Sequence, residues 1–343
     1  MRPTLLMLAL LTFSPILGAD ESARRFLGKP DSWFASDEAK QVAAIILSYQ
    51  ADAGGWPKNT DTISRPYAGD RAKLQPTFDN KATVDELRFM ARMVNATKDE
   101  TYRKSFDRGL NYVLAAQYPN GGWPQFFPLR QGYWDHITFN DDAMVRILRL
   151  VREVASDKTY GFVEATQREA CRKAFGLGID CILKCQIVID GKPTVWCAQH
   201  DEHSLAPAKA RKYELPSFSG FESVGIVRLL MSIEKPTPEV RASIEGAVAW
   251  LEAHQVTGLR LDTEKDKDGK TNLVMIPDAK APALWARFYD LQTGQPFVCD
   301  RDGIPKPKLA DIGYERRNGY SWFGEYARDL LAKEYRAWKQ SGR

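Results

Sequence analysis

Apolar residues recur along most of the chain with the spacing of amphipathic α-helices. The stretches 87–94 and 144–151 both carry apolar side chains at positions i, i+3, i+4 and i+7. Thr237 followed by Pro238 is typical of a capped helix start, with proline at the first helical position. We find no strand-rich half and no linker. The pattern therefore predicts an all-α protein with a single domain.

A repeat is superimposed on this helical pattern. Gln50, Gln117, Gln186 and Gln255 each close an amphipathic run, at intervals of 67, 69 and 69 residues. The first two runs are followed by a GGWP sequence, whereas the last two are not. Repeats of this length are pairs of helices. We predict an incomplete α/α toroid, in which each Gln satisfies backbone groups at a helix end and each Trp packs on the neighbouring unit.

The segments between the predicted helices include long loops rich in Gly, Pro and aromatic residues. They span Ser64–Gln75, Pro124–Asp135 and Lys192–Lys212. Loops of this length in a compact domain usually carry function. We expect them to lie together on one rim of the toroid.

The N-terminus has the composition of a secretory signal peptide. Arg2 is followed by a mostly apolar run over Leu5–Leu17 and then by small residues. We assign residues 1–19 to the signal peptide and 20–343 to the mature domain, which is expected to be secreted or periplasmic. No later stretch approaches the length of a membrane span, so no membrane partner is expected after removal of the signal.

The amino-acid composition limits which classes of molecule the protein is expected to bind. The net charge is +4, from 48 basic and 44 acidic residues, without a basic run, and this excludes nucleic acid as a partner. Nine Trp and 13 Tyr include side chains suited to stacking on sugar rings, although most are expected to pack in the core. The five cysteines have no metal-site spacing, and we interpret them as buried thiols.

A duplicated acidic motif is the main candidate for chemistry. TFDNKAT at 77–83 returns as TFNDDAM at 138–144, which places Asp79-Asn80 and Asn140-Asp141-Asp142 at helix starts. Carboxylate and amide oxygens are the ligands that Ca²⁺ prefers. Helix capping is the alternative role for such pairs, and the duplication does not decide between the two.

Further polar residues gather in the second half of the chain. VWCAQHDEHS at 195–204 contains two histidines without the i, i+4 spacing of a zinc helix, so zinc is not expected there. Arg211, Arg287 and Arg301 lie in segments that also hold aromatic residues. Guanidinium groups match carboxylates with two hydrogen bonds, so these segments suit an anionic sugar polymer.

Eight motifs in order identify a resemblance to the pectate lyases of polysaccharide lyase family 10, over nearly the whole mature chain. They are GGWPKN (54–59), TFDNKAT, GGWPQFFP (121–128), TFNDDAM, VWCAQHD (195–201), ARKYELPSFSGFES (210–223), LWARFYDL (284–291) and RDG (301–303). Members of this family are incomplete α/α toroids that cleave polygalacturonate by Ca²⁺-dependent β-elimination. The resemblance implies the same fold, substrate and cofactor here, and we expect a monomer.

The resemblance also implies roles for the acidic pairs. Asp79 and Asn80 match residues near the substrate, and Asp79 and Asp141 match residues at the calcium ion. Asp142 remains an alternative to Asp141, but the duplicated frame pairs Asn80 with Asp141 and favours the latter.

Three arginines acquire roles in the same way. Arg211 matches the catalytic base, while Arg287 and Arg301 match residues that bind uronate carboxylates. Because arginine holds its proton strongly, an arginine base implies an alkaline optimum.

Two other functions are compatible with the residues alone. A glycoside hydrolase would use two carboxyl groups chosen from the set Asp79, Asp141, Asp142, Glu214 and Glu222. A non-catalytic pectin-binding protein would bind the polymer without forming product. A terpene cyclase, which shares the Gln/Gly/Trp element, is not favoured because it would not be exported.

Overall fold

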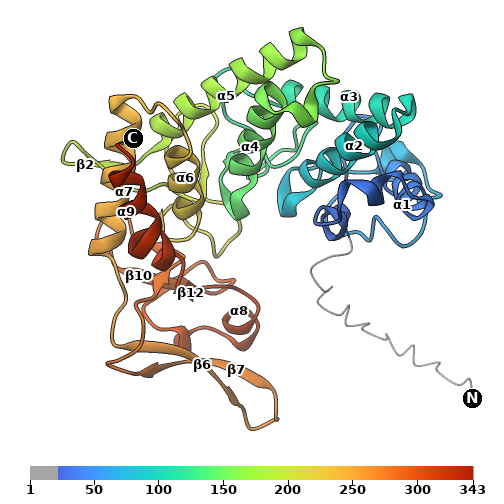
Figure 1. Cartoon of the computed structure of the whole chain (residues 1–343). Coiled ribbons are helices and arrows are strands. Elements are labelled where there is room, and N and C mark those ends of the chain that lie inside the picture. The colour runs from blue at the N-terminus through green and yellow to red at the C-terminus, as the bar shows by residue number, and fades with distance from the viewer. Residues whose placement is uncertain (1–21, 343) are drawn as a thin grey trace, which may run out of the picture.

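The computed structural model of the chain describes residues 22–342. Its helices stand side by side in an arc that begins with α1 and ends with α7 and α9 (Figure 1). The helices are α1 (Asp37–Ser48), α2 (Val84–Thr97), α3 (Glu100–Ala115), α4 (Ala143–Ser156), α5 (Ala165–Cys185), α6 (Glu222–Met231), α7 (Pro238–Ala253), α8 (Tyr314–Asn318) and α9 (Tyr335–Gln340).

The arc consists of two layers of paired helices. Helices α2, α4 and α6 contact one another in turn, and α3, α5 and α7 pack against them as the second layer. The arc does not close on itself, and its two ends lie apart in Figure 1. The predicted fold class, an incomplete α/α toroid of helix pairs, is confirmed.

The predicted structural role of the repeated glutamines is confirmed for three of the four. The Nε2 of Gln50 donates to the carbonyl of Gly54 at 2.7 Å and to that of Ser105 at 2.9 Å. Gln117 and Gln186 make the same two bonds, one to the loop that follows and one to the next outer helix. Gln255 is exposed and does not repeat the arrangement.

A repeated tryptophan extends through all four units. In each unit the indole N–H donates to a carbonyl near the end of the preceding helix. The bonds are Trp56 to Ile46 (2.8 Å), Trp123 to Val113 (2.8 Å), Trp196 to Ile182 (2.7 Å) and Trp285 to Leu251 (2.8 Å). All four side chains are buried. The repeat therefore persists in the third and fourth units, where the GGW sequence has disappeared.

Short strands link the helix pairs, and most of them follow α7. The strands are β1 (Ile137–Thr138), β2 (Val188–Ile189), β3 (Lys192–Pro193), β4 (Gln199–His200), β5 (Phe218–Ser219), β6 (Leu259–Lys265), β7 (Thr271–Pro277), β8 (Trp285–Ala286), β9 (Phe288–Tyr289), β10 (Pro296–Cys299), β11 (Pro305–Lys306) and β12 (Phe323–Gly324). All pairs are antiparallel, and β5, β9, β10 and β11 form one small sheet.

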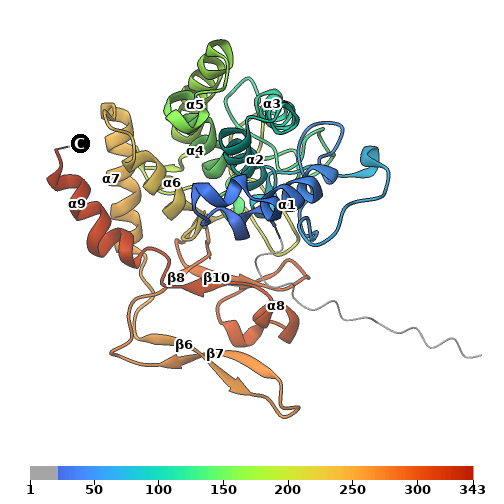
Figure 2. The same cartoon turned by 45° about the vertical axis from the view of Figure 1, so that its right-hand side comes forward.

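The strand-rich C-terminal part is a feature that the sequence analysis missed. The hairpin of β6 and β7 projects below the arc in Figure 1 and in Figure 2. Its turn contains Asp268-Gly269, and Gly269 has a φ of +73°. An Asp-Gly pair between two runs of seven strand residues is a strong hairpin signal that was available in the sequence.

Three further predictions concern the cysteines, the signal peptide and the absence of a membrane span. All five cysteines are buried and free, in agreement with their interpretation as buried thiols. The proposed signal peptide, residues 1–19, lies outside the described residues. Within residues 22–342, no helix has both the length and the apolar character that crossing a membrane requires.

Candidate functional site

The two copies of the acidic motif form the same backbone turn. Asn80 has φ 50° and ψ 34°, and Asp141 has φ 52° and ψ 34°. Left-handed backbone of this kind is tolerated best by Gly, Asn and Asp. The following helices, α2 and α4, have no side-chain cap at their first turns. The turns therefore support the frame that pairs Asn80 with Asp141, and they do not support a capping role.

The first turn, η4 (Asp79–Lys81), holds its aspartate in a buried position. Asp79 forms a short ion pair with Lys58, whose Nζ lies 5.3 Å from the centre of the Phe126 ring. The neighbouring Asn80 is exposed, and its Nδ2 donates to the side chain of Asn59 at 2.8 Å. This turn contacts the second turn, η5 (Asn140–Asp142). The two acidic motifs thus lie next to each other, as the duplication predicted.

In the second turn, the adjacent aspartates face different surroundings. Asp141 is 38% exposed at its side chain and forms an ion pair with Arg287 at 3.0 Å. Asp142 points between the helices towards Gly225, where an added Cβ would overlap its carboxylate. Burial raises the pKa of Asp142, and Arg146 and Arg149 on α4 oppose that rise. Of the two, Asp141 is the residue whose oxygens reach the site.

The backbone of Arg287 is fixed between two short strands. It lies between β8 and β9, its backbone N–H donates to the carbonyl of Trp322 at 2.7 Å, and its carbonyl accepts from Gly220 at 3.1 Å. Its Nη2 contacts Glu222, which is completely buried, and donates to Asn140 at 3.1 Å. Burial opposes the charge on Arg287, but Glu222 keeps its pKa well above the ordinary value.

Arg211 lies across the site from Arg287 and is paired with Glu214. Its Nε donates to Glu214 at 2.7 Å, and its Nη2 makes a shorter bond to the other carboxylate oxygen. Tyr320 donates its hydroxyl to the same carboxylate at 2.7 Å. Burial would lower the pKa of Arg211, yet Glu214 raises it above the ordinary value. Arg211 is therefore protonated in the free protein.

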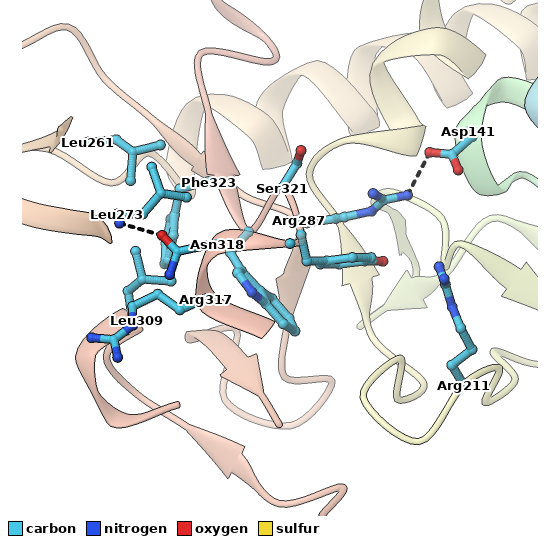
Figure 3. Close-up of a pocket in the computed structure, with 13 residues that line it drawn as sticks. Asp141, Arg211, Leu261, Leu273, Arg287, Leu309, Arg317, Asn318, Ser321 and Phe323 are labelled. Carbon is cyan, nitrogen blue, oxygen red and sulfur yellow. Dashed lines mark hydrogen bonds and ion pairs between the residues drawn. The ribbon is translucent and has the colours of Figure 1, made fainter. Parts of the chain in front are cut away.

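One cavity of about 470 Å³ brings three of the predicted site residues together. Asp141, Arg211 and Arg287 line it, and the ring of Tyr320 lies between the two arginines. Figure 3 shows the Arg211 side chain directed towards the pair formed by Arg287 and Asp141. Asp79, Asn80 and Arg301 do not line this cavity.

Arg301 occupies the margin of the site. Its side chain is 64% exposed and makes two bonds of 2.9 Å with Glu315. The guanidinium groups of Arg301 and Arg211 both lie against Tyr213, 5.8 Å and 5.1 Å from the centre of its ring. Arg301 is thus near Arg211 and accessible from solvent.

Some residues of the site were missed or were assigned differently from sequence. Tyr320 was not considered, because it lies in the C-terminal part and no local pattern singles it out. Glu214 and Glu222 were considered only as hydrolase acids, whereas the structure pairs each with an arginine. The three-residue spacing of Arg211 and Glu214 is a sequence signal of the first contact, whereas Glu222 and Arg287 are 65 residues apart and no local pattern links them.

Solved structures of one class resemble the whole chain. A family 10 polysaccharide lyase from Cellvibrio cellulosa is 33% identical and matches with a TM-score of 0.78 over 92% of this chain and 96% of its own. An aspartate-to-alanine mutant of a family 10 lyase from that organism, in complex with trigalacturonic acid, is also 33% identical and matches with a TM-score of 0.78 over 93% and 98%. The fold is therefore that of a polysaccharide lyase.

The family can be stated more closely. The model of the Pectic acid lyase family matches residues 50–331, and the chain belongs to this family. The protein is an enzyme of the pectate lyase class, with lyase activity on pectate. The comparison with curated proteins finds no match. Membership of a lyase family excludes the hydrolase and the non-catalytic binding protein as alternatives.

Proposed function

We propose that the enzyme cleaves de-esterified α-1,4-polygalacturonate by Ca²⁺-assisted β-elimination, with Arg211 as the base. The observation that carries this proposal is the convergence of Asp141, Arg211 and Arg287 on one cavity. These residues come from three distant segments of the chain. An aspartate beside two arginines suits an anionic sugar that is bound partly through a cation.

The proposed substrate follows from the positive charge around the cavity. Arg287 faces into it, and Arg301 is accessible at its margin. Guanidinium groups recognise carboxylates, whereas a methyl ester offers them no charge. The complex of the related Cellvibrio lyase with trigalacturonic acid supports the same substrate class for this chain.

The residues of the two turns fit a calcium ion chemically. Asp79, Asn80 and Asp141 provide carboxylate and amide oxygens on two turns that touch. Three side chains are fewer than the six to eight oxygens that Ca²⁺ takes, so substrate and water would complete the shell. When bound, calcium supplies positive charge that stabilises the negative charge developing on the substrate carboxylate.

The base is assigned to the Nη1 atom of Arg211. Nε and Nη2 are bonded to Glu214, while Nη1 makes no hydrogen bond within residues 22–342. In the reaction, the base takes the proton from C5, next to the uronate carboxylate. The electrons of that bond form the C4=C5 double bond, and the glycosidic oxygen leaves with its bonding pair and takes a proton from water.

The ion pair with Glu214 opposes the loss of a proton that Arg211 needs in order to act as a base. Arg211 must lose a proton before it can accept one, and Glu214 favours its charged form. Positive charge from Arg287, Arg301 and the cation acts in the opposite direction. We therefore expect activity to rise with pH on the alkaline side.

The ultraviolet absorbance of the unsaturated uronide on polygalacturonate tests the proposal. We expect product with Ca²⁺ and none after exhaustive EDTA treatment. Arg211→Ala is expected to lower turnover by roughly 10³- to 10⁴-fold with little change in substrate binding. Full turnover in EDTA would remove the cation from the mechanism, and a fast Arg211→Ala enzyme would move the base elsewhere.

We also propose that the enzyme acts outside the cytoplasm as a monomer. The support is the N-terminal composition, with Arg2 followed by the apolar run Leu5–Leu17, and a polymeric substrate that requires an exported enzyme. N-terminal sequencing of exported protein should find cleavage near residue 19, and light scattering should give the mass of one chain.

A further inference from the structure

A group of side chains able to bind a metal lies apart from the catalytic cavity. The antiparallel pairing of β1 with β4 places Ile137 opposite His200, so His136 and Asp201 meet just beyond the paired residues. Single ligand atoms of His136, Asp201 and Glu202 lie within 4.8 Å of one another. None of these residues lines the catalytic cavity.

A second histidine, His203, lies beside this group on its exposed side. The Nδ1 of His136 is 3.0 Å from Glu202 Oε2, and the Nε2 of His203 is 3.6 Å from Glu202 Oε1. The backbone of Glu202 is fixed by Asn120, whose Nδ2 donates to its carbonyl at 2.7 Å. One imidazole and two carboxylates thus converge on a point held by the β1–β4 pair and by the loop containing Asn120.

The charge of the group is not balanced by a fixed cation. The backbone N–H groups of His203 and Ser204 and the hydroxyl of Ser204 donate hydrogen bonds to the carboxylate of Asp201. Oδ1 of Asp201 accepts these bonds, while Oδ2 makes none within residues 22–342. In the same range no lysine or arginine pairs with Asp201 or Glu202, and the only basic partners of Glu202 are the two histidines.

From this geometry we propose a second metal site for Zn²⁺ or a similar transition metal, with His136, Asp201 and Glu202 as its protein ligands. Imidazole nitrogen with carboxylate oxygen suits zinc, whereas calcium prefers a shell of oxygens alone. His200 is excluded as a ligand. Its Nε2 accepts from the N–H of Cys197, its Nδ1 faces the carbonyl of Leu205, and it is buried.

Zinc is not expected in this segment from the sequence alone, because the local spacing of the histidines is wrong. The structure supplies the missing ligand from His136, which is 66 residues from Glu202. A metal here would join the segment that leads into the Asp141 turn to the loop that leads to Arg211. It would hold these two parts of the catalytic cavity together without taking part in the reaction, and this inference does not depend on the proposed mechanism.

The test is calorimetric titration of the purified full chain with Zn²⁺, after removal of metals by a chelator. We expect one site in the wild type and at least roughly tenfold weaker binding in both His136→Gln and Glu202→Gln, because losses in the outer shell of a metal already cost ten- to 100-fold. His254→Gln is the matched control. It removes a histidine outside the group, which stacks on Trp250 at 3.9 Å, and should bind zinc as the wild type does.

Two further measurements keep the outcome decisive. Asp79→Asn, which alters the proposed calcium site, should leave zinc binding unchanged, and zinc should raise the melting temperature of the wild type but not of His136→Gln. Circular dichroism establishes that each variant is folded. Equal zinc affinity in wild type and His136→Gln, or binding of Ca²⁺ in preference to Zn²⁺, would overturn the proposal.

Discussion

Glu214 bonds to Arg211 at both its backbone and its side chain. The backbone N–H of Arg211 donates to Glu214 Oε2 at 3.1 Å, and Nε donates to the same oxygen at 2.7 Å. The carboxylate therefore fixes where the guanidinium lies and also favours its protonated form. Orientation and basicity of the proposed base depend on one neighbour.

Glu214→Gln should separate these two effects. Glutamine keeps an oxygen acceptor but removes the negative charge, so the pKa of Arg211 should fall. Because the base must be unprotonated, the rise of kcat/KM with pH should move to lower pH, by roughly one unit. A pH profile of kcat/KM over the alkaline range measures this shift. An unchanged midpoint would mean that Arg211 does not set the profile.

Tyr320→Phe is the matched control for that experiment. The hydroxyl of Tyr320 donates to Glu214 at 2.7 Å but carries no charge in the working pH range, since burial raises its pKa well above the ordinary value. We expect a smaller movement of the profile than with Glu214→Gln. A larger movement would show that the Tyr320 hydroxyl, rather than the charge of Glu214, controls the base.

Asp141→Asn and Asp142→Asn should differ strongly in activity. Both residues have left-handed backbone, at φ 52° and 62°, and asparagine tolerates it, so the turn is preserved in each variant. Only Asp141 reaches the cavity. We expect Asp141→Asn to lower kcat/KM by roughly 100-fold and to need more Ca²⁺, with a much smaller loss for Asp142→Asn. The reverse order would place the calcium ligand at Asp142.

Arg287→Ala and Arg301→Ala should both lower activity but should differ in stability. Arg287 is paired with the buried carboxylate of Glu222, and its removal leaves that charge uncompensated. A loss of about 3–5 kcal/mol is expected from such a change. Arg301 is exposed, so its loss should leave the free energy of unfolding nearly unchanged. Urea unfolding of the two variants gives the comparison.

The buried carboxyl of Glu86 should make the free energy of unfolding depend on pH. Burial and the neighbouring charge of Asp85 raise its pKa from 4.5 to about 8, so it stays protonated when folded while the unfolded chain ionises. The contribution of Glu86 to the free energy of unfolding should be greatest below pH 4.5 and fall as pH rises to about 8, by up to about 1.4 kcal/mol per pH unit. Glu86→Gln should flatten this part of the curve in urea unfolding. An equal slope in the variant would assign the dependence to other groups.

The parts of the fold and of the site that could be predicted from the sequence are those encoded by local patterns. The amphipathic spacing gave the helices, and the duplication of Asn80 and Asp141 indicated that the acidic turns lie together. The roles proposed for Arg211 and Arg287 came from the motifs that carry the family resemblance. The bond between Arg287 and Asp141 joins residues 146 positions apart, and no local pattern encodes it.

Other features depend on tertiary contacts and were not predictable in this way. Strands of two residues, such as β8 and β9 on either side of Arg287, carry no periodicity of their own and exist only through their partners. The hydrogen bond from Tyr320 to Glu214 likewise joins residues 106 positions apart. The hairpin of β6 and β7 is different, because its Asp-Gly turn could have been recognised.

The left-handed turns at Asn80 and Asp141 limit which amino acids can occupy these positions. Asparagine and aspartate are the side chains that tolerate this backbone and also carry oxygen donors, and they differ by a single atom. A change from Asp to Asn removes one negative charge without disturbing the turn. Relatives of this enzyme could therefore gain or lose affinity for a cation through single substitutions at these two turns, while the toroid that carries them stays the same.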